Sequence, residues 1–298
     1  HRVFFNDFNI GFSIPSSDCC SLCVSLRNQI KNESDFRKRS ALITELRVHK
    51  MRAKAFYALM NEQPDGCPVF CFDMQQVQPL PHTPIQDSFY ARQISFYALC
   101  CTDVRTKSIF FYCWTENQAG RGSSEVGSAV LAHLESSNFE GISSVRLFCD
   151  GCGGQNKNSH IVHCLCYWLL RRSPNNVKEI LLTFPVRSHS FLAADRAFGR
   201  VEQILRKYPV LTTKEEYIQL YSQVRTVRIL GEHWKLWDVK MLQNVYQKMP
   251  GIQDLKRIYR LKDSVKGKLT YRVKGLQNFR FESDTETFFQ PYKKRKEP

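Results

Sequence analysis

The order in which strand-forming and helix-forming segments follow one another constrains the fold of this chain more than any other feature. Three apolar, strand-forming runs come first, and strands then alternate with helices. Strands that no crossover helix separates form an antiparallel meander, whereas strands separated by helices join by right-handed parallel crossovers. The pattern therefore predicts an α/β domain with a mixed five-stranded sheet flanked by helices. The expected strands span residues 68–73, 93–102, 108–115, 144–150 and 178–185, and the expected helices span 124–136, 159–171 and 191–207.

Two further regions flank this central pattern. A long basic helix is expected over 35–61. From about residue 210 the chain changes to two expected helices, over 213–221 and 233–248, and then to segments that alternate basic and apolar residues as edge strands do. We therefore expect an N-terminal Cys/His and helical segment over 1–65, a central α/β domain over 66–208, and a basic C-terminal helical and β extension over 209–298.

The charge balance indicates a polyanionic partner. Lys and Arg number 43 against 28 Asp and Glu, which gives a formal charge of +15. Nucleic acids and acidic membrane surfaces attract such a chain. No apolar run reaches the roughly eighteen residues that a membrane span needs, so no such span is expected. Residues 293–298, KKRKEP, resemble a nuclear-import signal, although so short a basic run also arises by chance. We expect a nuclear protein.

Four acidic residues stand where the expected strands and helices end or begin. They lie at the end of the first strand, at the start of the first helix, at the end of the fourth strand and near the start of the last helix: Asp73, Glu125, Asp150 and Asp195. Two divalent ions about 4 Å apart promote the cleavage or transfer of phosphodiesters. Such hard cations prefer carboxylate oxygens. The four acids are therefore candidates for holding two Mg or Mn ions if the fold brings them together.

Several short segments, taken in order, resemble a family of transposon-derived proteins of eukaryotic genomes. These segments read FDMQQVQPLP, FYARQISFY, RGSSEVGSAVL, FCDGCGGQNKN and SHSFLAADRAFG, and the resemblance covers roughly Phe12 to Lys207. It implies a ribonuclease H-like fold with strand order 3-2-1-4-5, in which the first and fourth strands are neighbours.

The same resemblance implies roles for individual residues. The four acids would hold the metal ions, as in nucleases of this fold. His189 and Arg196 would be neighbours of the site. In transposases of this fold the last acid is commonly Glu, so Glu202, two helical turns beyond Asp195, competes for that place.

Each acid also has an ordinary structural interpretation. Asp150 begins a segment of turn-forming residues, and Glu125 would complement the dipole of its helix. Asp195 could form an ion pair with a neighbouring arginine. Asp73 is harder to dismiss, because a carboxylate that ends the apolar run VFCF is costly to leave unpaired.

Cysteines near the N-terminus predict a second metal site. Cys20 and Cys23 have the spacing of a zinc knuckle, and His49 follows on the expected helix. The fourth ligand stays open among the cysteines Cys19, Cys67 and Cys71. Free thiols in a loop are the alternative. We expect a structural Zn²⁺, since no general base is evident nearby.

Two segments are candidates for nucleic-acid contacts. Glycines after Asp150 would allow a phosphate backbone to approach, with contacts from Gln155, Asn156 and Asn158, although a loop that leads into a helix explains these residues nearly as well. Between Lys256 and Lys274 there are eight basic residues against one acid. A phosphate-binding groove and a charge-protected edge strand both fit. The candidate residues here are Lys256, Arg257, Arg260, Lys268, Arg272 and Lys274.

The leading hypothesis is a two-metal DNA nuclease or strand-transferase that acts on transposon ends or related DNA. A domesticated, inactive protein that binds DNA or chromatin is the rival, and an exonuclease acting on RNA or DNA ends is a third hypothesis. Transposases commonly act as dimers or larger assemblies, so a homodimer or higher oligomer is considered, although no heptad pattern supports it.

Overall fold

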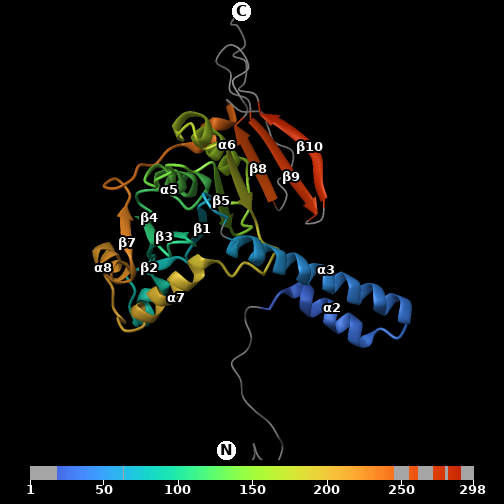
Figure 1. Cartoon of the computed structure of the whole chain (residues 1–298). Helices are drawn as coiled ribbons and strands as arrows, with labels where there is room; N and C mark the ends of the chain where they lie inside the picture. Colours follow the sequence, from blue (N-terminus) through green and yellow to red (C-terminus); the bar gives the residue numbers. More distant parts are fainter. Residues whose placement is uncertain (1–18, 63, 245–254, 261–270, 279–280, 290–298) are drawn as a thin grey trace, which may run out of the picture.

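A single mixed β-sheet organises the described part of the chain. The computed structural model describes residues 19–62, 64–244, 255–260, 271–278 and 281–289 (Figure 1). The ten strands of this part follow the order β10-β9-β8-β6-β5-β1-β3-β4-β7, and β2 pairs with β3. Their bounds are β1 Val69–Met74, β2 Gln78–Leu80, β3 Ile94–Asp103, β4 Ile109–Thr115, β5 Ser144–Cys149, β6 Glu179–Thr183, β7 Thr226–Ile229, β8 Leu255–Arg260, β9 Tyr271–Asn278 and β10 Phe281–Phe289.

The prediction of an α/β domain with a mixed sheet flanked by helices is confirmed. The five expected strands are β1, β3, β4, β5 and β6, and they lie in the order β4-β3-β1-β5-β6. The meander pairs are antiparallel, and β5 is parallel to both β1 and β6. The helices are α2 Ser21–Asn32, α3 Phe36–Asn61, α4 Gln86–Tyr90, α5 Ser123–Glu135, α6 Ser159–Tyr167, α7 Ala193–Leu205 and α8 Lys214–Val224, with a π-helical turn η1 Trp168–Arg172 and a 3-10 turn η2 Val239–Asn244.

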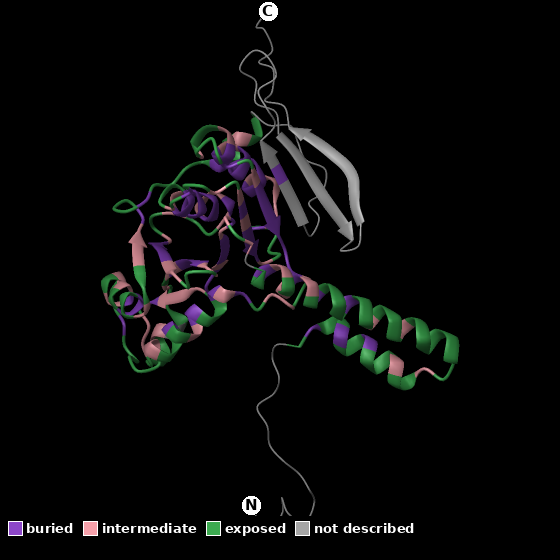
Figure 2. Ribbon diagram, viewed as in Figure 1, coloured by how far each residue is buried: buried purple, intermediate pink, exposed green. Residues whose placement is uncertain are grey.

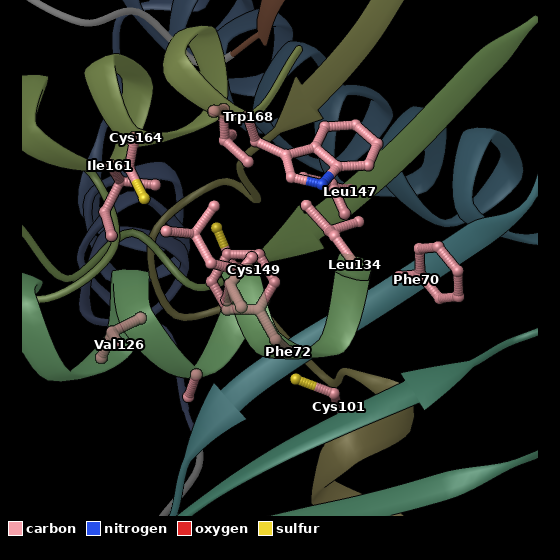
Figure 3. Close-up of a cluster of buried hydrophobic side chains, with 14 of the residues drawn as sticks. Phe70, Phe72, Cys101, Val126, Leu134, Leu147, Cys149, Ile161, Cys164 and Trp168 are labelled. Carbon is pink, nitrogen blue, oxygen red and sulfur yellow. The ribbon is translucent and has the colours of Figure 1, made fainter. Parts of the chain in front are cut away.

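Alternation along β1 sends side chains into two separate cores. Phe70 and Phe72 join a cluster with residues of α5 and α6 (Figure 3). Val69 and Cys71 join the other cluster, with residues of α3, α7 and α8. Burial of both faces explains why the central strands read as nearly continuous apolar runs. Figure 2 shows this buried centre and the exposed surface around it.

The cysteines of the apolar strands and of α6 are buried free thiols. Cys100, Cys101, Cys113 and Cys149 on the strands, and Cys164 and Cys166 on α6, are all free and buried. Burial raises the pKa of each of these thiols. They therefore act as small apolar side chains that complete the core.

The N-terminal segment forms a helical hairpin that projects from the sheet (Figure 1). The expected long helix is present as α3, which Asp35 caps by accepting hydrogen bonds from the backbone N–H groups of Arg37 and Lys38. Helix α2 was not predicted, because its apolar residues are too few to mark a clear stripe. The end of α3 packs on the sheet, where Phe56 is fully buried.

The C-terminal segment extends the sheet at both edges. Strand β7 pairs with β4, and β8 pairs with β6. The prediction of a helix over 233–248 is wrong for residues 233–244, where only the short 3-10 turn η2 forms. Residues 245–248 lie outside the described part. No helix in the described ranges is both long and apolar enough to cross a membrane.

Candidate functional site

Two of the predicted acids end neighbouring parallel strands. Strands β1 and β5 pair so that Phe72 lies opposite Cys149, and Asp73 and Asp150 come next in each strand. Alternation places Asp73 on the same face as Cys71, and Asp150 on the same face as Phe148. Both of these neighbours belong to the core beneath α7. The two carboxylates therefore share the face of the sheet that α7 covers.

Electrostatics supports this arrangement. The pKa of Asp73 is raised to about 8, first because burial desolvates its carboxyl and then because the charges of Asp150 and Asp195 repel it. The N–H of Met74 donates to Asp73 Oδ1 at 2.8 Å, and this bond and the charge of Arg121 lower the pKa. Three of the four predicted acids are thus close enough to interact.

Helix α7 supplies the third carboxylate. Asp195 is exposed, and its Oδ2 accepts a hydrogen bond from the N–H of Leu192 at 2.6 Å, which caps the helix. Its pKa is raised, first by partial desolvation and then by Asp150, while the Leu192 hydrogen bond and Arg196 lower it. This carboxylate therefore has both a capping role and an acidic neighbour across the site.

The fourth predicted acid is used differently. The carboxylate of Glu125 accepts hydrogen bonds from the N–H groups of Gly120 at 3.1 Å and Gly122 at 2.8 Å. Both oxygens thereby cap α5, which packs on the face of the sheet opposite α7. Asp73, Asp150 and Asp195 act on one another through their charges, whereas the contacts shown for Glu125 are those that cap its own helix.

The loop after Asp150 also differs from its predicted role. Asn156 is fully buried and donates a hydrogen bond to Asp150 Oδ1, so it is not available to a nucleic acid. Asn158 caps α6, accepting from the N–H of Ile161 at 3.1 Å. Gln155 is half-buried and donates to the carbonyl of Arg121 at 3.5 Å. This loop is built to hold Asp150 rather than to present amides to a ligand.

A cleft of about 660 Å³ opens beside Asp195. Asp195 and Glu202 line it from α7, Met74 and Gln75 line it from the end of β1, and Ser188 lines it from the loop before α7. Glu202 lies on the same flank of α7 as Asp195, so it can still compete with Asp195 for the place of the last acid. Asp73 and Asp150 do not line this cleft, although Met74, the residue after Asp73, does.

The predicted cysteine site is larger than the sequence indicated. Cys20, Cys23, His49 and His189 form a cluster that could hold a metal ion, with ligand atoms all within 4.8 Å of one another. The Cys20 sulfur lies 3.4 Å from His49 Nε2, and the Cys23 sulfur lies 3.5 Å from His189 Nε2. Among the described residues, only this group of three or more metal-binding side chains is so compact; the carboxylates are more widely spaced.

His189 therefore has a different place from the one predicted. It was expected beside the carboxylates, but it completes the cysteine cluster from the loop between β6 and α7. His189, rather than one of the three candidate cysteines, is therefore the fourth member of the cluster. Cys19 is exposed, and Cys67 and Cys71 are buried elsewhere. No sequence signal links His189 to residues so far away in the chain.

Neighbouring groups hydrogen-bond to residues of the cluster and shift the pKa values of His49 and Cys23. The Tyr57 hydroxyl donates to the carbonyl of His189 at 3.0 Å. Burial lowers the pKa of His49, and the charge of His189 lowers it further. The pKa of Cys23 is raised by burial and then by its hydrogen bond with Cys20. Two cysteines and two histidines are a donor set typical of zinc.

Arg196 was predicted to be a neighbour of the site, and its charge lowers the pKa of Asp195. It lies on the opposite flank of α7 from Asp195 and Glu202 and lines a second cleft of about 490 Å³. The sequence did not reveal this cleft, because its residues come from distant segments.

The basic tail forms strands at the edge of the sheet. Lys256, Arg257 and Arg260 lie on β8, and Arg272 and Lys274 lie on β9, where Arg257 is the register partner of Lys274. Lys268 lies outside the described residues. The alternation of basic and apolar residues correctly indicated strands.

Comparison with known families gives one match. Residues 104–294 match the family described as Domain of unknown function (DUF7869). The match includes Glu125, Asp150, His189 and Asp195, and it begins after Asp73. No curated protein matches the chain.

Proposed function

The chain belongs to the family described as Domain of unknown function (DUF7869), and from its site we propose a metal-dependent nuclease or strand-transferase that acts on DNA. The observation that carries the proposal is that Asp73, Asp150 and Asp195 lie close enough for their charges to act on one another, with Asp195 also lining a cleft. The strand order β4-β3-β1-β5-β6 supports the finer proposal of a ribonuclease H-like domain.

The donor set suits Mg²⁺ or Mn²⁺. Carboxylate oxygens are the ligands that these hard cations prefer, and bound cations would offset the repulsion that raises the pKa of Asp73. Two such ions would activate water or a DNA 3'-hydroxyl and stabilise the leaving oxygen.

The chain's own groups would prepare this chemistry. Asn156 fixes the orientation of Asp150 by its hydrogen bond, and the Met74 N–H does the same for Asp73. Glu202, further along the cleft, could replace or assist Asp195. Since Asp195 also caps α7, its carboxylate is held by the helix that forms the cleft wall.

We also propose that Cys20, Cys23, His49 and His189 bind a structural Zn²⁺. The cluster joins both helices of the N-terminal hairpin to the loop that leads into α7. Tyr57 connects this site with the acids, because its hydroxyl bonds His189 and its pKa is raised by burial and then by Asp195. Zinc would therefore stabilise the position of the cleft wall.

The formal charge of +15 supports DNA as the partner, and the KKRKEP segment supports a nuclear protein, although that segment lies outside the described residues. A homodimer or higher oligomer stays a proposal that rests on the family resemblance alone.

A second candidate function is a transposase-derived protein that binds DNA or chromatin without cutting it. Two observations favour it: Glu125 is occupied by its helix cap, and the acids are less compact than the Cys/His cluster within the described part.

A cleavage assay separates the two functions. Supercoiled and linear DNA would be incubated with the protein and Mn²⁺ or Mg²⁺, and the reaction compared with that of Asp73→Asn and Asp150→Asn. We expect both variants to lose cleavage by about a hundredfold or more while they still bind DNA. Asp87→Asn, an exposed acid on α4, is the matched control. Cleavage that survives in both site variants, or its absence in the unmodified protein with either metal, would refute the nuclease. Cleavage of linear DNA alone would indicate an exonuclease.

A further inference from the structure

A second cleft, on the other flank of α7, gathers positive charge from three separate segments. Arg196 and Arg200 come from α7, Lys107 from the turn between β3 and β4, and Arg225 from the end of α8. The cleft measures about 490 Å³. Residues that are distant in sequence thus place four cations around one hollow.

Arg196 has an acidic neighbour, because its charge lowers the pKa of Asp195, but no direct bond joins any of the four cations to an acid in the described part. None of the four side chains forms a hydrogen bond or ion pair within the residues that the structure describes. The one carboxylate that lines the cleft, Asp103, accepts hydrogen bonds from the N–H groups of Arg105 and Thr106. The cations therefore exceed the acids by three, and a bound anion would relieve their mutual repulsion.

Helix α7 separates this basic cleft from the acidic one. Asp195 and Glu202 line one flank, and Arg196 and Arg200 line the other. A helix with its side chains is about 10–12 Å across, a span that about three nucleotides of a strand cover at about 3.4 Å each. A strand that crosses α7 can therefore reach both clefts.

The surface of α7 suits such a crossing. Gly199 lies within the helix, and a Cβ built there would meet no other atom within 4 Å. Glycine weakens a helix interior, so its place here is not explained by helix stability. Gly199 lines the acidic cleft, so its bare backbone allows a strand to come close to α7 on that flank.

We propose that Lys107, Arg196, Arg200 and Arg225 bind a backbone phosphate of a DNA strand, and that a phosphodiester about three nucleotides away on the same strand lies at the carboxylates. Binding itself does not require cleavage, but the stated position of the strand rests on the proposed function. Arginine suits this role, because its planar guanidinium can donate two parallel hydrogen bonds to a phosphate.

Salt-dependent binding tests the proposal. Affinity for a fluorescent DNA oligonucleotide would be measured in EDTA over a range of KCl concentrations. We would compare the unmodified protein with two double variants. One carries Arg196→Gln and Arg200→Gln, and the other carries Arg196→Lys and Arg200→Lys. The Gln double variant should weaken binding at least tenfold and reduce the slope of log K against log salt by about 0.7–0.9 for each lost phosphate contact. The Lys variant should keep most of the slope.

A matched control removes two charges elsewhere. Arg171→Gln with Lys178→Gln changes exposed cations on η1 and beside β6, and we expect it to leave the slope within about half a unit. Thermal melting of each variant verifies folding. Equal loss of slope in this control, or an unchanged slope in the Arg196 and Arg200 variant, overturns the proposal.

Two further measurements distinguish a failure of the phosphate-site proposal from a failure of the nuclease proposal. A reduced slope together with no cleavage by the unmodified protein refutes the nuclease and leaves the phosphate site standing. Titration with inorganic phosphate identifies a small-anion site: if phosphate binds through Arg196 and Arg200 while the slope for DNA is unchanged, the cleft does not bind DNA and the proposal is wrong.

Discussion

The Nε2 atoms of His49 and His189 lie 3.0 Å apart, although 140 residues separate them in the chain. Two imidazole nitrogens at this distance, with two sulfurs close by, bring helix α3 and the loop before α7 together around one point. The same loop leads to Asp195. The Cys/His cluster that could hold a metal ion is therefore joined through this loop to the helix that carries Asp195.

Zinc should contribute to the stability of the fold. Removing it with a chelator, or replacing Cys23 with Ser or His189 with Ala, should lower the melting temperature by about 5 °C or more, because bound metal stabilises only the folded chain. Metal analysis should find about one zinc per chain, and none in the variants. Cys152→Ser, at an exposed cysteine, is the control. Zinc-free protein that melts at the same temperature would contradict the assignment.

Asp73→Asn should stabilise the metal-free protein. The folded pKa of Asp73 is about 8, above the ordinary value of 3.8. The carboxyl therefore favours the fold while it is protonated, and this contribution is lost as pH rises through 8. At pH 9 in EDTA the variant should be more stable by about 1–3 kcal/mol, and the gain should shrink at pH 5.

Bound Mn²⁺ should reverse this difference in stability between Asp73→Asn and the unmodified protein. Mn²⁺ should raise the melting temperature of the unmodified protein and of Asp87→Asn, but not that of Asp73→Asn, because the variant lacks a ligand. Equal stabilisation of all three proteins by Mn²⁺ would place the ion elsewhere.

His133 should make the fold sensitive to mild acid. It is buried beside Phe70 and Tyr112, and burial lowers its pKa from 6.5 to about 4. Between these values the unfolded chain takes up a proton that the folded chain does not, so stability is lost as pH falls. The loss should reach about 3 kcal/mol at pH 4. Denaturant titrations of His133→Gln should lack this component, whereas His233→Gln, at an exposed histidine, should retain it.

Two glycine variants should have opposite effects on stability. Gly199→Ala meets open space and should stabilise α7 by about 0.5–1 kcal/mol. Gly127→Ala, within α5, would bring a Cβ to 3.3 Å from Cys164 and Val239 and should destabilise the fold by about 1–3 kcal/mol. Chemical denaturation measures both. If a DNA strand crosses α7, Gly199→Ala should also weaken DNA binding despite its greater stability.

Local patterning predicted the secondary structure of the central domain and some of the site. Apolar runs such as VFCF before Asp73 indicate strands whatever their neighbours, because burial of both faces demands apolar residues at every position. The Asp35 cap of α3 and the turn-forming residues after Asp150 are equally local. The sequence by itself thus determined five strands of the central sheet, most helices, and the acids near the ends of β1 and β5.

Only the tertiary structure decided which side chains meet. His189 joins the cysteines rather than the acids, Asn156 is buried against Asp150, and Glu125 closes its own helix. The four cations of the second cleft come from three segments that no spacing connects. The physical reason is that periodicity sets the face of a strand or helix on which a residue lies, whereas contacts between distant residues depend on how whole elements pack.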